Sequence, residues 1–319
     1  MRILIAGFGG WNNCGDEAIL QAIMDELGNH DYIVSTTLPF QFLPSYCVKI
    51  PNLIDARQIY DIRTDVDAYL LGGGKLNWGY GWRQALAMFS ANVPSMNYAV
   101  AYGKHPSLYH SKLNRLYAEF LSQFNAVTVR DQDSFDLLSE LGVQSTLTMC
   151  PAINLKEEKI DCPEGMIAVC PRYEDSDQMG NPGNNQPQID WIVNRLKGLE
   201  DEVLLIPFAP KDMEGKPVDL ALCREISTRL KGAPILSVDF NPRQVKYAIS
   251  KSRLVISGGR YHAVLWAIAH NVPYEVSPTQ SYKRITALIS THQKYGDKLK
   301  EMEKANVNIF RKIMNGDKN

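Results

Sequence analysis

The sequence predicts an α/β protein built of two Rossmann-like domains that face each other across a cleft. Apolar runs of strand length alternate with segments of helical period along the chain, which is typical of βα units and parallel sheets. The length of 319 residues suits two domains, since one domain takes roughly 100–200 residues. The charged stretch Asn154–Pro163 interrupts the alternation. We therefore expect an N-terminal domain over residues 1–155, a C-terminal domain over 164–290 and a helical segment over 291–319.

In the first domain, each expected strand is a short apolar run, and each expected helix repeats apolar residues every three or four positions. The expected strands are Ile3–Ala6, Tyr32–Thr36, Ala68–Leu71, Ser95–Val100 and Ala126–Val129. The expected helices include Asp16–Leu27, Gly81–Ala91, Ser107–Phe124 and Ser134–Leu141.

The second domain shows the same alternation of strands and helices. The expected strands are Met166–Cys170, Val203–Pro207, Pro234–Val238, Leu254–Ser257 and Tyr274–Val276. The expected helices lie near Gln188–Leu199, Val218–Leu230, Pro242–Ser250 and Tyr261–Ala269. Ligands of such sheets bind at the carboxyl ends of the strands, so the site is expected between the two domains.

Two segments outside this alternation carry other signals. Asp175–Pro187 is rich in Gly, Pro and Asn and predicts a long loop, either a functional lid or a disordered segment. Thr291–Met314 predicts a charged helix that packs on the outside, with a return to the first domain as one option and no chemistry of its own. Its apolar positions are Leu299, Met302, Ile309 and Ile313.

The charge balance excludes whole classes of partner. The chain has 34 Lys and Arg against 35 Asp and Glu, for a formal net charge of -1. Binding of nucleic acid or of an anionic membrane through the overall field would need a basic excess. The N-terminal run MRILIAG is too short for a signal-peptide core, and no stretch reaches the roughly 18 apolar residues of a membrane span. We expect a cytoplasmic protein.

The cysteines predict neither disulfides nor a zinc site. They form no CxxC pair and have no histidine at metal-ligand spacing. We expect reduced and mostly buried thiols and no bound metal, with Cys14 as the exception to watch because it lies in a turn beside a helix start. The cysteines are Cys14, Cys47, Cys150, Cys162, Cys170 and Cys223.

The first βα turn resembles a dinucleotide fingerprint only at a glance. A G-x-G-x-x-G motif starting at Gly7 requires glycine at position 12, where the chain has Asn12. Asp16 and Glu17 at the start of the next helix would compete with a bound pyrophosphate, so NAD is not expected. Two interpretations stay open: a glycine-rich turn with Asp16 as the N-cap, or a turn whose residues Asn12 to Asp16 contact a substrate.

Two strand ends of the first domain are candidate anion sites. Gly72, Gly73, Gly74 and Lys75 follow one strand, where backbone N–H groups could converge on an anion or where the glycines simply allow close backbone approach. Arg130 follows another strand, where it either faces a substrate anion or forms an ion pair with Asp131.

The second domain carries the sharpest signal. Arg172 ends an apolar strand just before the polar loop, which favours anion binding. In Ile256–Ala263 another strand runs into Gly258 and Gly259, then into Arg260 and His262 at the start of an apolar helix. Helix N–H groups, a guanidinium and an imidazole together could bind a phosphate and move a proton, whereas the alternative is a satisfied capping histidine.

Six segments, taken together and in this order, resemble the polysaccharide pyruvyltransferase family. They span about residues 1–275. The resemblance implies a fold like that of type B glycosyltransferases and transfer of pyruvate from phosphoenolpyruvate to a sugar, commonly as a cyclic ketal on two hydroxyls. The segments are GGWNNCGDEAIL at 9–20, YLLGGGKLN at 69–77, VTVRDQDSFDLLSELGV at 127–143, CPAINL at 150–155, VCPR at 169–172 and SGGRYHAVLWAIAHNVP at 257–273.

The resemblance also assigns roles. Phosphoenolpyruvate carries a phosphate and a carboxylate, so Arg172 and Arg260 become its anchors and His262 its proton donor or phosphate ligand. Gly258 and Gly259 join this donor side. Phosphoenolpyruvate is then a co-substrate, and no cofactor is expected. Asp16 is a candidate base in an acceptor-binding set of Asn12, Asp16, Gly73, Gly74, Lys75 and Arg130.

The chain departs from the family pattern in three places. Residues 99–106 replace a glycine-rich run, Gly258 and Gly259 replace a serine and a bulky residue, and Cys150 replaces an aspartate. The first and third departures leave the identity of the acceptor open. The sequence also leaves open whether Lys75 or His105 takes part in the reaction. The alternatives are a glycosyltransferase with a nucleotide-sugar donor and a non-catalytic protein that binds a glycan or nucleotide.

Overall fold

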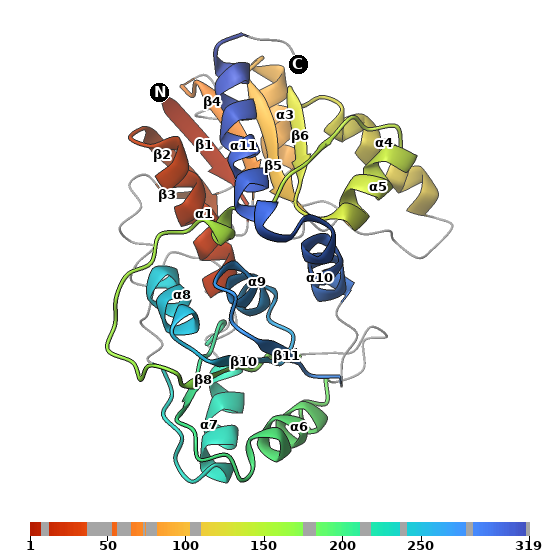
Figure 1. Ribbon diagram of the computed structural model, residues 1–319. Helices are drawn as coiled ribbons and strands as arrows, with labels where there is room; N and C mark the ends of the chain where they lie inside the picture. The colour runs from red at the N-terminus through yellow and green to blue at the C-terminus, as the bar shows by residue number, and fades with distance from the viewer. Residues whose placement is uncertain are drawn as a thin grey trace. The chain divides into compact units, whose positions relative to one another are not determined.

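The computed structural model describes residues 1–7, 13–36, 53–55, 65–72, 74, 82–102, 110–174, 183–210, 218–236, 241–278 and 283–316. The chain divides into two compact units. The first comprises Met1–Gly10, Asp16–Leu155 and Ala287–Asn319, and the second comprises Trp11–Gly15 and Lys156–Thr286. Figure 1 colours the chain from the N-terminus to the C-terminus and labels the elements used below.

Among the described residues, the first unit holds a seven-stranded parallel sheet in the order β3-β2-β1-β4-β5-β6-β7. The side chains of β4 and β5 are buried throughout, as expected of parallel strands covered on both faces. The strands are β1 (Arg2–Ala6), β2 (Asp31–Thr36), β3 (Leu53–Asp55), β4 (Ala68–Gly72), β5 (Ser95–Val100), β6 (Ala126–Val129) and β7 (Thr146–Leu147).

Helices cover both faces of this sheet (Figure 1). On one face α3 (Trp82–Ser90), α4 (His110–Leu121) and α5 (Gln132–Glu140) bury a core with stacked aromatic rings, among them Tyr69 and Phe124 with centroids 6.2 Å apart. α1 (Cys14–Leu27) and α11 (Leu299–Met314) lie on the other face. The 3₁₀ turn η4 (Pro151–Ile153) follows β7 and contacts α11.

The C-terminal helix α11 packs on β5 and β6 of the first sheet. Its buried face mixes apolar residues with Glu303 and Asn306, whereas Met302 and Ile309, two of the apolar positions expected to be buried, are only partly covered. The Thr128 hydroxyl donates to Asn306 Oδ1 at 2.7 Å, and the Asn154 amide donates to Glu303 Oε2 at 2.7 Å. The burial of Glu303 and Asn306 was not predicted, because the spacing of apolar residues carries no information about which polar residues are buried.

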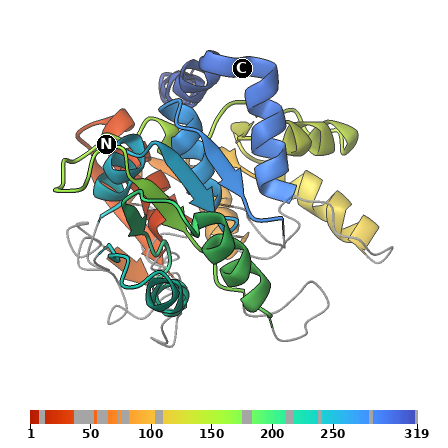
Figure 2. The same cartoon turned by 60° about the horizontal axis from the view of Figure 1, so that its bottom comes forward.

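The second unit holds a four-stranded parallel sheet, within the described residues, in the order β11-β10-β8-β9. Figure 2 shows α6 and α7 in front of this sheet, and α8 and α9 lie behind it. The strands are β8 (Ile167–Cys170), β9 (Val203–Leu205), β10 (Leu254–Ser257) and β11 (Tyr274–Val276). The helices of this unit are α6 (Gln186–Leu196), α7 (Asp219–Arg229), α8 (Pro242–Ser250) and α9 (Tyr261–Ala269). Helix α10 (Lys283–Tyr295) belongs to the first unit from Ala287 onward, as does the 3₁₀ turn η5 (Gly296–Lys298).

The predicted parallel α/β fold is confirmed, with differences at four elements. β3 and β7 were missed because runs of three and two residues are too short to show a period. The expected strand Pro234–Val238 is reduced to an isolated bridge between Ile235 and Leu205, and its last two residues lie outside the described part. α1 begins at Cys14, so the interpretation of Asp16 as the N-cap was wrong, and Asp16 lies in the first turn.

Two other sequence predictions concern thiols and membrane segments. Of the five cysteines in described positions none forms a disulfide, four are buried and Cys162 is partly exposed, as expected, while Cys47 lies outside the described residues. None of the described helices combines the length and the apolar character that crossing a membrane requires.

Candidate functional site

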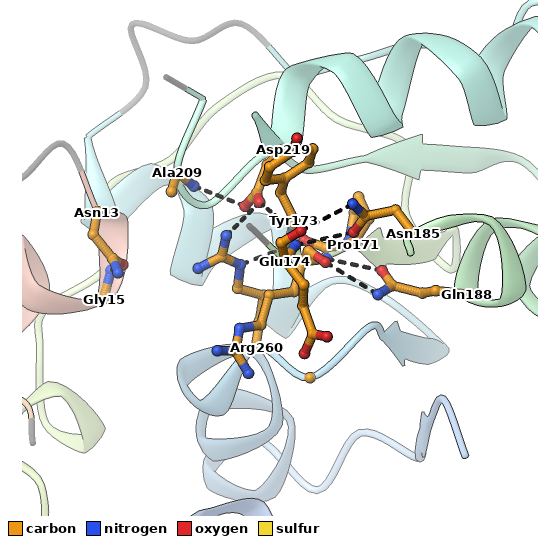
Figure 3. A network of polar contacts seen from close by, with 12 residues as sticks. Asn13, Gly15, Pro171, Tyr173, Glu174, Asn185, Gln188, Ala209, Asp219 and Arg260 are labelled. Atoms are coloured by element: carbon orange, nitrogen blue, oxygen red, sulfur yellow. Dashed lines mark hydrogen bonds and ion pairs between the residues drawn. The ribbon is translucent and has the colours of Figure 1, made fainter. Parts of the chain in front are cut away.

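Three loops of the second unit meet at one buried carboxylate, that of Asp219. Asp219 opens α7 and its side chain is fully buried. Its Oδ1 accepts a hydrogen bond from the Tyr173 N–H at 2.9 Å, after β8, and its Oδ2 accepts one from the Ala209 N–H at 2.9 Å, after β9. The third contact is an ion pair with Arg260, after β10 (Figure 3). The carboxylate therefore joins the carboxyl ends of three adjacent strands.

Arg260 is held from its backbone to its guanidinium. Ser257 Oγ accepts hydrogen bonds from the Gly259 N–H at 3.1 Å and the Arg260 N–H at 2.9 Å. Gly259 has φ +106°, a conformation that favours glycine. At the other end, Arg260 Nε donates to the Pro171 carbonyl at 3.4 Å and Nη2 donates to Asp219. The Arg260 side chain is 13% exposed, so a ligand at the strand ends can reach it.

The backbone of Arg172 is clamped by a buried side chain, Gln188 on α6. Gln188 Oε1 accepts from the Arg172 N–H at 2.9 Å, and Gln188 Nε2 donates to the Arg172 carbonyl at 3.0 Å (Figure 3). A Cβ at Gly258 would lie 2.1 Å from Gln188 Oε1 and 2.9 Å from the Arg172 nitrogen. Gly258 thus leaves the space that the clamp occupies.

Asn185 fixes the next acidic residue, Glu174, in the same two-bond manner. Asn185 Oδ1 accepts from the Glu174 N–H at 2.9 Å, and Asn185 Nδ2 donates to the Glu174 carbonyl at 3.2 Å. Partial burial raises the pKa of the Glu174 carboxyl above its usual value, and the nearby Arg172 charge opposes that shift. The loop after β8 therefore carries a cation and an acid on a fixed backbone.

His262 lies in the first turn of α9 among aromatic rings and is 8% exposed. Its ring centroid is 5.1 Å from that of Tyr261 and 6.1 Å from that of Trp266. A Cβ at Gly15 would lie 1.9 Å from His262 Nδ1, so the imidazole packs directly on the Gly15 backbone. Only glycine fits at position 15 with the imidazole in this place.

The turn that carries Gly15 is fixed by two hydrogen bonds. The Cys14 N–H donates to the Phe208 carbonyl at 2.7 Å, and the Gly15 N–H donates to Asn13 Oδ1 at 3.0 Å. These bonds and the contact with His262 place residues 13–15 in the second unit. The sequence interpretation connected this turn with the acceptor and did not foresee its contact with His262.

The structure describes only some of the residues predicted to bind the acceptor. Asp16, in the first turn of α1, is partly buried, and Gly74 is buried with φ +67°. Asn12, Gly73, Lys75 and His105 lie outside the described residues, as does most of the loop Asp175–Pro187. The role of this set in acceptor binding stays a prediction.

Arg130, the remaining predicted contact, is 1% exposed at the end of β6. Its Nη1 lies 4.0 Å from Cys150 Sγ, and burial raises the pKa of that thiol to about 11 although the Arg130 charge opposes the shift. Asp131 serves as the N-cap of α5, where it accepts hydrogen bonds from the Ser134 N–H at 2.8 Å and hydroxyl at 2.6 Å. The Asp131 carboxylate thus has a structural role of its own.

The family model of polysaccharide pyruvyl transferases matches residues 13–273, and this stretch includes every element that carries the network around Asp219. The chain belongs to the polysaccharide pyruvyl transferase family. This assignment confirms the resemblance seen in the sequence and makes the protein a transferase. No curated protein matches the chain significantly.

Solved structures with low identity share the fold. The UDP-N-acetylglucosamine 2-epimerase from Rickettsia bellii has 10% identity and a TM-score of 0.58, with 99% of this chain and 97% of that chain covered. The Neisseria meningitidis UDP-GlcNAc 2-epimerase bound to UDP-GlcNAc has 13% identity and a TM-score of 0.58, with 97% of this chain and 94% of that chain covered. The Methanocaldococcus jannaschii UDP-GlcNAc 2-epimerase in complex with UDP-GlcNAc and UDP has 10% identity and a TM-score of 0.53, with 100% of this chain and 94% of that chain covered. These likenesses confirm a two-domain Rossmann-like fold of the type B glycosyltransferase kind.

Three residues of the network were missed by sequence reasoning: Asp219, Gln188 and Gly15. An aspartate in the first turn of a helix is ordinarily explained by the helix dipole, and a glutamine near a helix start carries no signal of its own. Gly15 was present in the segment that resembles the family, but its partner His262 is remote in sequence. Only the folded chain connects these residues with the predicted anchors.

Proposed function

We propose that the protein transfers pyruvate from phosphoenolpyruvate to a sugar of a polysaccharide or of its precursor, as a ketal, and releases phosphate. The observation that carries the proposal is the family match over residues 13–273, which contains Arg172, Arg260 and His262. Around Arg172 and Arg260, loops after β8 and β10 are fixed by buried Gln188 and Asp219. Two arginines on loops whose backbone is fixed suit a donor that carries a phosphate and a carboxylate.

The donor side is assigned to the second unit. Arg172 and Arg260 bind the two anionic groups, and Gly258 and Gly259 keep the strand end free of side chains that would obstruct the donor. His262 donates a proton to the methylene carbon of phosphoenolpyruvate, which becomes a methyl group, and the adjacent carbon becomes electrophilic. The aromatic rings of Tyr261 and Trp266 around the imidazole limit access of water to that step.

The acceptor side supplies two hydroxyl groups. The first hydroxyl attacks the electrophilic carbon, the carbon–oxygen bond to phosphate breaks, and the second hydroxyl closes the ketal. One hydroxyl proton balances the proton given to the methylene group, and the other leaves with phosphate. Asp16 is the proposed base, with Asn12, Gly73, Gly74, Lys75 and Arg130 as further acceptor contacts. The reaction requires neither a redox cofactor nor a metal ion.

Phosphate release from phosphoenolpyruvate in the presence of a panel of free, lipid-linked and nucleotide-linked sugars tests this function. We expect release that depends on the acceptor and that is lost in the Arg260→Ala variant. Release of a nucleoside diphosphate from nucleotide sugars, without phosphate release from phosphoenolpyruvate, would establish a glycosyltransferase instead. Ligands that raise the melting temperature without any turnover would indicate a non-catalytic binding protein.

A further inference from the structure

The ion pair between Asp219 and Arg260 uses one edge of the guanidinium. Arg260 Nε donates to the Pro171 carbonyl at 3.4 Å, and Nη2 donates to Asp219 Oδ1. A guanidinium has five N–H groups in a planar fork, so the opposite end, made of Nη1 and the second hydrogen of Nη2, is left over. No residue in the described part of the chain accepts a hydrogen bond from Nη1. The protein thus holds the side edge of the fork and leaves its end for a ligand.

The Asp219 charge is compensated by more than Arg260. Two backbone N–H groups donate to the carboxylate at 2.9 Å each, and the residue lies in the first turn of α7, where the helix dipole favours a negative charge. These contacts share the compensation of the carboxylate, so it does not draw on the whole charge of Arg260. Arg260 therefore remains attractive to an anion while its direction is fixed.

The same carboxylate also acts on the neighbouring anchor. Its bond to the Tyr173 N–H fixes the residue that follows Arg172, and Gln188 fixes Arg172 itself. Asp219 thereby sets the backbone of one anchor and the guanidinium of the other. A free Arg260 side chain would have to lose rotamer entropy on binding the donor, and a positioned one has already lost it.

We propose that Asp219 is a positioning residue for donor binding: it holds Nη2 of Arg260, beside the bond from Nε to the Pro171 carbonyl, so that the Nη1 end meets the phosphate or carboxylate of phosphoenolpyruvate. This inference rests on the proposed function for the identity of the donor. The ordering of Arg260 by Asp219 is a property of the protein alone and can be measured without any donor.

The first experiment therefore uses no substrate. Arg260 in the full-length protein is labelled with phenylglyoxal, and its modification rate is measured by mass spectrometry of the peptide. Asp219→Asn keeps an oxygen acceptor for the Tyr173 N–H but removes the counter-charge, so we expect Arg260 to react roughly tenfold faster. The matched control is Glu275→Gln, which neutralises the acid of a different Arg–acid pair of the second unit, Arg195–Glu275. An unchanged Arg260 rate in Asp219→Asn overturns the proposal.

The second experiment measures steady-state kinetics with phosphoenolpyruvate. We expect Asp219→Asn to raise KM for phosphoenolpyruvate roughly tenfold, with KM for the sugar unchanged, because only donor binding depends on the Arg260 direction. A merely structural role would lower the amount of active protein and leave KM for the donor unchanged, which also overturns the proposal. If the wild type does not use phosphoenolpyruvate, the proposed function fails while the labelling result still decides the role of Asp219.

A third measurement covers the case in which Asp219→Asn does not fold. A crystal structure of the wild-type protein soaked with phosphoenolpyruvate, or with inorganic phosphate if the former does not bind, shows which end of Arg260 holds the anion. We expect contact with Nη1 and a retained bond between Nη2 and Asp219. An anion on the Nε–Nη2 edge with Asp219 displaced, or an anion that avoids Arg260, overturns the proposal.

Discussion

The two units each bury a carboxylate completely, and they treat its charge in opposite ways. Asp219 in the second unit receives two backbone N–H groups and a guanidinium. Glu303 in the first unit receives the Asn154 amide and lies near another acid, Glu26. Burial and that second acid raise the pKa of Glu303 to about 8. One unit thus surrounds its buried carboxylate with donors and a cation, whereas the other raises the pKa of its buried carboxyl until it holds a proton near neutral pH.

The difference has a functional meaning in this fold. The compensated carboxylate lies at the strand ends, where a fixed charge can orient a ligand-binding arginine. The protonated one lies on the buried face of α11, where it is part of the packing of the helix on the sheet. The predictions below test this contrast, beginning with the largest expected effect.

Removal of Arg260 should affect both activity and stability. Arg260→Ala removes a donor anchor, for which a loss in turnover of about 100-fold or more is expected. It also leaves Asp219 buried without its cation, which should lower the free energy of unfolding by about 3 kcal/mol while the protein still folds. Turnover assays and urea denaturation measure the two effects.

A double-mutant cycle sharpens the same point. Arg260→Ala combined with Asp219→Asn should destabilise the protein less than the sum of the two single changes. Either single change already breaks the ion pair, so the second change does not cost that energy again. Strict additivity would show that the ion pair does not stabilise the unit, and unaltered turnover in Arg260→Ala would remove this residue from the site.

Gly15→Ala tests how tightly the second unit holds His262. The new Cβ would lie 1.9 Å from His262 Nδ1, so the imidazole must move. We expect a loss of stability of about 2 kcal/mol and a roughly tenfold fall in kcat, measured by thermal unfolding and phosphate release. Gly142→Ala is the control, because it adds a Cβ in open space at φ +73° and should cost stability alone. A normal kcat in Gly15→Ala contradicts the role given to His262.

Glu303→Gln tests the uncompensated carboxylate through pH. The pKa of Glu303 is raised from 4.5 to about 8 in the folded protein, so the native state binds the proton more tightly than the unfolded chain does. This stabilisation is complete below pH 4.5 and is lost as the pH rises towards 8. Between those limits the wild type should lose on the order of 4 kcal/mol more than Glu303→Gln, in urea denaturation at a series of pH values.

The control for this experiment is Glu301→Gln, on the exposed side of the same helix. Its stability should follow the wild-type pH dependence. Parallel pH profiles for Glu303→Gln and the wild type would mean that Glu303 is ionised in the folded protein, and the contrast with Asp219 would then disappear.

Arg172→Lys should have the smallest effect of the series. Gln188 holds the backbone of residue 172, which a lysine leaves in place. A point charge cannot reproduce the planar fork, so KM for phosphoenolpyruvate should rise by about fivefold with little change in kcat. An unaltered KM would give Arg172 a purely structural role.

The local hydrophobic pattern of the sequence was sufficient to predict most of the helices and strands. The limits of β5, β6, β10 and α9 agree with the predicted ones, because apolar periods of two or of 3.6 residues report burial directly. The pattern failed at β7, where two residues carry no period, and on α11, where Glu303 and Asn306 are buried among apolar residues. Polar burial depends on partners such as Asn154 and Thr128, which no local pattern reveals.

The sequence by itself determined the two parallel sheets and the family, because the hydrophobic period and the order of the motifs can be read from the chain, and it predicted Arg172 and Arg260 as anchors. Only the tertiary structure decided what holds those anchors. Asp219 meets Arg260 from a position 41 residues away, and Gly15 meets His262 from the other end of the chain. The reason is physical: strand order and loop path bring the ends of β8, β9 and β10 together, and only there do their polar atoms acquire partners.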